Sequence, residues 1–170
     1  ADYGGGLDAD LDQTQDNRLG ITHASEMAAE YHLSKEAFSL CGKINGAATA
    51  KGQAHNKNFA KHLATMGEPY ELFDAKQMRE ITGSSHYEDG LFTPGTAMIQ
   101  PAMYIRGVAD GLRQDGVTIY ENSPVTALNN DGNWVAETQQ GQVSSAHVIL
   151  AVNGHLNSFG FAKSRLMHVF

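Results

Sequence analysis

Acidic residues recur at short intervals near the start of the sequence, in a spacing that suggests calcium binding. They lie at Asp8, Asp10, Asp12 and Asp16. An EF-hand loop that began at Asp8 would need glycine at its sixth position and glutamate at its twelfth, where this sequence has Gln13 and Leu19. The calcium pattern therefore fails. Because glycine and aspartate favour turns over regular structure, residues 1–20 are predicted to form a solvated acidic loop.

Histidine is the next candidate for metal binding, with eight copies in the chain. His55 and His62 lie seven residues apart on a predicted helix and so share one face. Zinc-binding helices favour spacings of three to five residues, with a further ligand nearby. The sequence also contains scattered histidines at His86, His147, His155 and His168. We expect surface or packed histidines and no metal site.

The remaining reactive side chains favour structural roles. Cys41 stands among small residues and is predicted to be a buried, inert thiol. Glu88 and Asp89 form a tight acidic pair, which a solvated turn explains better than acid–base catalysis. The sequence has no GxSxG, P-loop or HExxH motif. No catalytic residue is therefore nominated.

The composition places the chain among globular proteins and limits its partners. It has 170 residues, of which 41% are hydrophobic and 18% charged, enough for one ordinary domain or part of a larger one. The net charge of −7 and the lack of a Lys- or Arg-rich stretch argue against nucleic acid as a partner. The longest apolar run, Val148 to Val152, is too short to span a bilayer. A single cysteine fits a reducing compartment, so we expect a cytoplasmic protein.

The first half of the chain predicts short helices around one strand. Apolar spacing indicates two helical stretches between residues 22 and 40. A strand is predicted within residues 41–50 and an amphipathic helix over residues 56–66. Asp74 and Gln77 form an approximate capping box that opens another short helix.

The second half predicts one helix followed by several strands. Leu91 and Phe92 form a short strand, and the helix covers residues 102–114 with Pro101 in its first turn. Further strands are predicted over residues 117–120, 124–128, 134–138 and 147–152, the last of them buried on both faces. The expected fold class is therefore α+β, with a mixed sheet and packed helices.

Several segments in the second half follow one another in a recognisable order. They are GLFTP at residues 90–94, QPAMYIRGVADGL at 100–112, GVTIYENSPV at 116–125, VAET at 135–138, Gly141, and AHVILAVNG at 146–154. In order and spacing the chain resembles the FAD-dependent oxidoreductases of the D-amino-acid oxidase and dehydrogenase type. That family includes glycine and sarcosine oxidases and gamma-glutamylputrescine oxidoreductase.

The resemblance implies an FAD cofactor and the residues that contact it. The glycine run near the start, otherwise a flexible terminal loop, would lie beside the flavin, because glycine lets a ligand approach the backbone closely. A strand would pass the adenine edge with its backbone, and a small turn after the apolar strand would lie near the nucleotide. The implied cofactor-binding residues are Gly4, Gly5, Gly6, Val125, Ala151, Asn153 and Gly154.

One part of the family pattern is missing from this sequence. The family begins with a strand–GxGxxG–helix unit whose glycines bring the pyrophosphate to a helix N-terminus, and no such unit occurs here. The chain also opens at Ala1 and closes in the apolar run from Arg165 to Phe170. We therefore expect a fragment, and expect the intact protein, not this chain alone, to bind FAD well.

The resemblance also divides the chain by role. Residues 1–40 would be a remnant of the FAD-binding region, and residues 41–128 would form substrate-domain strands and helices. Residues 129–170 would form a meander and a buried strand that return to the FAD-binding region. The expected fold is thus a substrate-domain-type sheet with remnants of an FAD-binding domain.

The implied function is oxidation of the C–N bond of an amine or amino acid to an imine, with hydride transfer to the flavin. The partner would be a small-molecule amine or amino-acid substrate. A non-catalytic ligand-binding or interaction module on the same scaffold is the alternative, because fold does not fix function. Unpaired strands at the cut edges would also favour a homodimer of the fragment.

Overall fold

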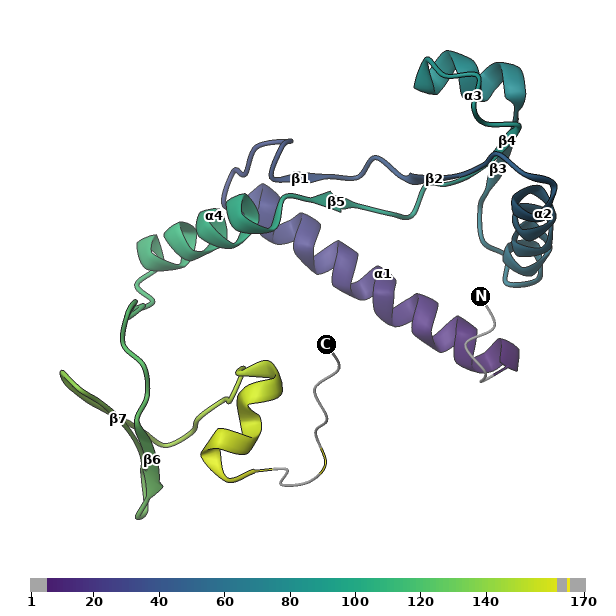
Figure 1. Cartoon of the computed structure of the whole chain (residues 1–170). Coiled ribbons are helices and arrows are strands. Elements are labelled where there is room, and N and C mark those ends of the chain that lie inside the picture. Colours follow the sequence, from purple (N-terminus) through teal and green to yellow (C-terminus); the bar gives the residue numbers. More distant parts are fainter. Residues whose placement is uncertain (1–5, 162–164, 166–170) are drawn as a thin grey trace. The chain divides into compact units, whose positions relative to one another are not determined.

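The fold is described from a computed structural model, which defines residues 6–161 and residue 165. The chain divides into two compact units, residues 1–117 and residues 118–170 (Figure 1). Helices and antiparallel strands alternate in the described part of the first unit, whereas strands come before a short helix in the second. This is the mixed helix and sheet fold expected from the sequence.

The first unit begins with a long helix, α1 (Gly6–Glu30), where a solvated loop was predicted over residues 1–20. The prediction is wrong for residues 6–20, and residues 1–5 lie outside the described part of the chain. Asp8 lies in the first turn of α1, where a carboxylate interacts favourably with the positive end of the helix dipole. An aspartate such as Asp8, which suggests a turn when it is considered alone, lies here at the start of a helix.

The chain after α1 turns without forming the second predicted helix. Ser34 Oγ accepts a hydrogen bond from the Ala37 amide at 3.2 Å, which closes the turn. Strand β1 (Phe38–Ser39) follows and pairs antiparallel with β5 (Met98–Ile99). The hydroxyl competes with helical hydrogen bonding here, as Ser often does near chain turns.

The core of the first unit is a three-stranded antiparallel sheet with helices on its two faces (Figure 1). Its order is β2 (Lys43–Ala47), β4 (Asp89–Thr93) and β3 (Glu71–Asp74). Leu91 of the central strand is fully buried and packs against Leu63 of α2 (Ala50–Thr65). Side chains alternate along a strand, so the Cβ position of its neighbour Gly90 lies on the other face of the sheet. On that face Met78 of α3 (Ala75–Thr82) lies against Gly90.

Local capping signals fix the starts of both covering helices. Thr49 Oγ1 accepts a hydrogen bond from the Gly52 amide at 3.2 Å, so α2 begins earlier than the predicted residue 56. The capping box predicted for α3 is confirmed: Asp74 Oδ1 accepts from the Gln77 amide at 2.8 Å, and Gln77 Oε1 accepts from the Asp74 amide at 2.9 Å. Gly83 ends α3 in the left-handed conformation.

The helix predicted over residues 102–114 is confirmed as α4 (Pro101–Gln114). It packs against the end of α1 and the turn that follows it. The side chains of Tyr31 and Leu33 lie against Gly111 and Gly107 of α4. Tyr104 of α4 donates a hydrogen bond from its hydroxyl to the Ala24 carbonyl of α1 at 2.9 Å.

The second unit contains a three-stranded antiparallel meander. Its strands are β6 (Ala127–Asn130), β7 (Trp134–Thr138) and β8 (Gly141–Ser145), followed by the 3₁₀ helix η1 (Asn153–Phe159). The strands predicted over residues 117–120 and 147–152 are not formed in the described structure. An apolar run becomes a strand only where a neighbour accepts its backbone hydrogen bonds. Among residues 6–161, no helix is both long and apolar enough to cross a membrane.

Candidate functional site

Val125, an implied cofactor contact, lies on a groove of the second unit. The groove has a volume of about 510 Å³. Its lining comes from the segment before β6 and from the meander: Tyr120, Ser123, Val125, Ala136, Thr138 and Gln140–Val143. The side chain of Val125 is half-exposed, at 39% of its full accessible surface. The predicted strand through Val125 instead begins two residues later, at Ala127.

The backbone around Val125 is held by the meander yet leaves polar groups available. The Thr126 amide donates to the Glu137 carbonyl at 2.8 Å, and the Thr126 hydroxyl donates to the same carbonyl at 3.2 Å. The N–H and C=O of Val125 make no hydrogen bond to another described residue. Val125 therefore has a backbone donor and a backbone acceptor that no described residue uses, and such groups can pair with the edge of a planar heterocycle.

The other implied residues of this unit lie after the meander. Ala151 is exposed, in a segment without regular structure, and Asn153 opens η1 with a positive φ of 50°. Gly154 follows within η1, and the His155 amide donates to the Val152 carbonyl at 3.0 Å. The chain therefore turns tightly here, as predicted. The residues that line the Val125 groove do not include Ala151, Asn153 or Gly154.

Gly6, the described member of the glycine run, begins α1 in the first unit. Gly4 and Gly5 lie outside the described residues. Gly6 has a φ of +79°, and no atom lies within 4 Å of the place that a Cβ would take. Free amide groups in the first turn of a helix attract anions. The open backbone of Gly6 at the start of a 25-residue helix therefore suits close approach of an anionic group.

These features fit the flavin nucleotide that the sequence resemblance implies. Gly6 leaves open backbone at a helix N-terminus, and Val125 offers an unpaired donor and acceptor on a groove. The two sets belong to separate units of the chain. Gly6 and Val125 can supply backbone hydrogen bonds and let a ligand approach the backbone closely. Neither residue has a reactive side chain.

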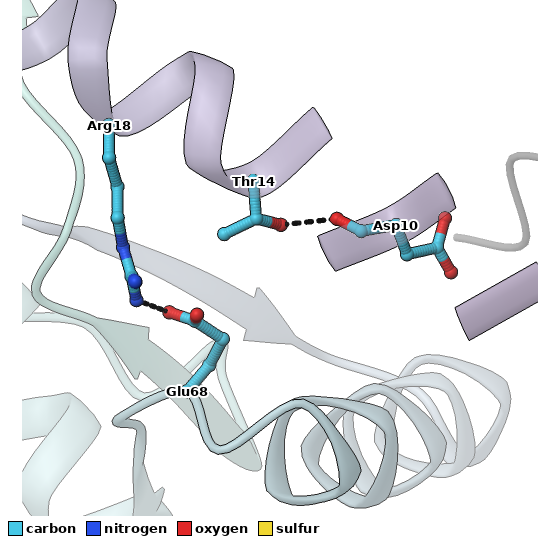
Figure 2. A network of polar contacts seen from close by, with 4 residues as sticks. All are labelled: Asp10, Thr14, Arg18 and Glu68. Atoms are coloured by element: carbon cyan, nitrogen blue, oxygen red, sulfur yellow. Dashed lines mark hydrogen bonds and ion pairs between the residues drawn. The ribbon is translucent and has the colours of Figure 1, made fainter. Parts of the chain in front are cut away.

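A buried acid on α1 was missed by the sequence analysis. Asp10 was assigned to a solvated loop, but it is 7% exposed. Its Oδ2 lies 3.1 Å from His62 Nε2 on α2. In Figure 2 the Asp10 carboxylate lies apart from a second polar link between these parts of the chain, the ion pair of Arg18 with Glu68. The Asp10 main-chain carbonyl accepts from the Thr14 hydroxyl at 2.8 Å.

The earlier interpretations of Cys41 and Asp89 require correction. Cys41 is exposed, and its thiol lies 3.4 Å from the Gly42 carbonyl. Asp89 is part of β4, and its Oδ1 accepts from Asn56 Nδ2 at 2.9 Å. Asn56 is 3% exposed and donates from the same nitrogen to the Asn45 carbonyl, so it ties α2 to the sheet. The acid at position 89 is thus a packing residue, not part of a solvated turn.

Metal binding has no support from side-chain geometry in the described part of the chain. Over those residues, no three His, Cys, Asp or Glu side chains gather closely enough to hold an ion. His55 stacks on Phe59 with ring centroids 6.4 Å apart, and His62 pairs with Asp10. Both are therefore packed or paired histidines.

Comparison with known proteins finds relatives that match about half of this chain. Gamma-glutamylputrescine oxidoreductase from Escherichia coli (strain K12) is 35% identical over 86 residues, covering 51% of this chain and 20% of that protein. Mitochondrial dimethylglycine dehydrogenase from Rattus norvegicus is 34% identical over 84 residues, covering 48% of this chain and 9% of that protein. The chain thus spans only a small part of these relatives.

Solved structures show the same fold at low sequence identity. Glycine oxidase from Geobacillus kaustophilus has a TM-score of 0.66 at 17% identity, covering 81% of this chain and 38% of its own. L-proline dehydrogenase from P. horikoshii also has a TM-score of 0.66, at 15% identity, covering 85% of this chain and 39% of its own. The family described as DAO, FAD dependent oxidoreductase, matches residues 5–169. The chain therefore belongs to the FAD dependent oxidoreductase family.

Proposed function

We propose that this chain is part of an enzyme that oxidises the C–N bond of an amine or amino acid to an imine. The family match over residues 5–169 carries the proposal. The names of its relatives support the substrate class, since they include a gamma-glutamylputrescine oxidoreductase, a dimethylglycine dehydrogenase and a glycine oxidase. All three names specify a compound with an amine nitrogen.

In this proposal, bound FAD would supply the hydride acceptor. The hydride would come from the carbon that bears the nitrogen. The residues of this chain bind and orient the cofactor through their backbone. The Val125 N–H and C=O would pair with the adenine edge, and residues of the turn that follows residue 150 would let the chain pass close to the nucleotide. The glycine run at residues 4–6 would lie beside the flavin. The assigned residues are Gly4, Gly5, Gly6, Val125, Ala151, Asn153 and Gly154.

We further propose that the working enzyme includes a strand–GxGxxG–helix unit that this sequence lacks. The matched stretch covers 20% of the E. coli relative, which leaves ample sequence for such a unit. Its glycines and helix N-terminus would provide the hydrogen bonds to the pyrophosphate. In this arrangement residues 1–40 and 129–170 serve the cofactor region, and residues 41–128 contribute to the substrate domain.

The proposal is tested on the protein expressed from its complete reading frame. We expect a GxGxxG unit upstream and a bound flavin whose visible absorption band bleaches anaerobically when an amine or amino acid is added, but not when the matching alcohol is added. The 170-residue chain alone should lose added FAD on gel filtration. A complete reading frame without the fingerprint, or a flavin that no amine bleaches, would favour a non-catalytic module instead.

A matched pair of variants of the protein expressed from its complete reading frame tests the role of Val125. Val125→Pro removes the N–H assigned to the adenine edge, whereas Val125→Thr keeps the backbone donor and a similar side-chain volume. Since no described residue accepts from that N–H, the folded structure loses no hydrogen bond. FAD affinity should fall by roughly tenfold or more in the proline variant alone. Equal FAD affinities for both variants, with unchanged circular dichroism, would remove Val125 from the site.

A further inference from the structure

A cleft between the start of α1 and the later turns of α2 contains a buried carboxylate oxygen without a partner. The side chain of Asp10 is 8% exposed. Its Oδ2 is 3.1 Å from His62 Nε2, whereas Oδ1 makes no hydrogen bond within the described structure. Leaving a buried acceptor unpaired is costly, and native structures rarely do so. The unpaired oxygen therefore points to a donor that binds in the cleft.

The cleft has the size and lining of a small-molecule site. Its volume is about 540 Å³, within the range of ligand pockets. Helical spacing brings one face of each helix to it, and the lining includes Leu7, Asp10, His55, Phe59, His62 and Thr65. Leu7 is 42% exposed, so an apolar surface borders the buried carboxylate.

We propose that this cleft binds a small organic ammonium ion through Asp10. An ammonium N–H donates to Oδ1 of Asp10, and the apolar part of the ligand lies along Leu7 and Phe59. Asp10 Oδ1 has no partner, and a hydrogen bond to a carboxylate is stronger when its donor is a cation, which favours a cation over a neutral donor.

The other cations are poor candidates for this carboxylate. The Arg18 guanidinium is engaged with Glu68 and lies apart from the Asp10 carboxylate (Figure 2). A metal ion would need further ligands, and the described residues offer no cluster of three metal-binding side chains. Gly6, assigned above to the flavin, also lines this cleft. The binding test below uses no flavin, so its outcome is distinguishable from that of the proposed oxidation.

The binding test uses the 170-residue chain with n-butylammonium and, as the neutral probe of similar shape, 1-butanol. Each is titrated at about pH 8, above the ordinary titration range of imidazole, while NMR follows the ring C–H signals of His55 and His62. We expect saturable shifts with butylammonium and at least roughly tenfold weaker binding of butanol. Equal affinity for the two probes, or no saturable shift with butylammonium, would overturn the proposal.

A charge-matched pair of variants locates the binding group. Asp10→Asn removes the buried carboxylate with little change in volume, and Asp12→Asn removes an exposed carboxylate from the same helix. Butylammonium affinity should fall by roughly tenfold or more in the first variant and stay unchanged in the second. Equal losses in both would show general charge attraction and overturn the assignment. If Asp10→Asn fails to fold, the comparison of the two probes on the unmodified chain decides the matter.

Discussion

At the scale of single residues, two glycines of α4, Gly107 and Gly111, lie against the turn that follows α1. A Cβ at Gly111 would stand 2.1 Å from Cδ1 of Tyr31, and one at Gly107 would stand 2.3 Å from Cδ2 of Leu33. Neither distance is compatible with van der Waals contact. The Tyr31 ring is rigid and meets the Gly111 position with three atoms, so packing requires glycine there, whereas at Gly107 the clashing atom is the flexible end of the Leu33 side chain. Both glycines lie in a helix, where glycine is intrinsically unfavourable.

Gly111→Ala should consequently destabilise the chain. The gain in helix propensity is about 0.5–1 kcal/mol, whereas forcing a methyl group into packed side chains costs about 1–3 kcal/mol. Gly20→Ala is the matched control, since Gly20 lies within α1 with no atom near its Cβ position. Urea titrations should give a lower free energy of unfolding for Gly111→Ala and a higher one for Gly20→Ala. A stabilised Gly111→Ala variant would contradict the packing of α1 on α4.

The hydrogen bond between Tyr31 and Asp115 gives this contact a pH dependence. The Tyr31 hydroxyl donates to Asp115 Oδ2 at 2.9 Å, and this bond, with smaller effects of burial and acidic neighbours, raises the pKa of Tyr31. Because the folded state holds the proton more tightly, the contribution to stability is present below the ordinary tyrosine pKa of about 10. It is lost as the pH rises through the higher pKa of the folded chain.

We therefore expect Asp115→Asn to lower the pKa of Tyr31 in an ultraviolet titration of the phenolate. Tyr31→Phe identifies its signal among the six tyrosines. Asp110→Asn is the control, because Asp110 lies on the same helix and accepts from Arg113 at 2.9 Å. It should leave the Tyr31 transition in place. An unchanged Tyr31 pKa in Asp115→Asn would mean that the hydrogen bond does not form in solution.

At the scale of elements, α3 shows how much a local signal can determine. The helix has only eight residues, too few to be stable alone, yet its capping box places Met78 against Gly90 of the sheet. Asp74→Ala should cost about 0.5–2 kcal/mol of unfolding free energy, and Asp74→Asn, which keeps an acceptor at the cap, much less. Urea titrations followed by circular dichroism measure both values. Equal losses would mean that the charge, and not the cap, stabilises α3.

Elements with such local signals could be predicted from the sequence, and elements that depend on distant partners could not. The capping box of α3 and Pro101 at the start of α4 were sufficient to predict these two helices. Residues 147–152 were not, because their apolar run forms no strand without a neighbouring strand. The same limit applied to the site. The Asp10–His62 pair joins two helices far apart in the sequence, so neither residue alone suggested it.

At the scale of the whole molecule, the buried apolar core lies in one unit. The buried hydrophobic residues of the described chain all belong to residues 1–117: Ala28, Ala37, Phe38, Ala47, Ala60, Leu63, Met78 and Leu91. The described part of residues 118–170 contributes none to this set. A three-stranded meander needs a buried apolar face or a packed helix to be stable by itself. We therefore expect the second unit to be the less stable of the two.

The two units should accordingly unfold at different urea concentrations. Trp134 is the single tryptophan and lies in β7, so its fluorescence reports on the second unit. Far-ultraviolet circular dichroism reports mainly on α1, α2 and α4 of the first unit. We expect the fluorescence midpoint at a lower urea concentration than the dichroism midpoint, because the second unit buries less apolar surface. Coincident midpoints would show that the chain unfolds as one cooperative body, with the meander stabilised by the same core as the helices.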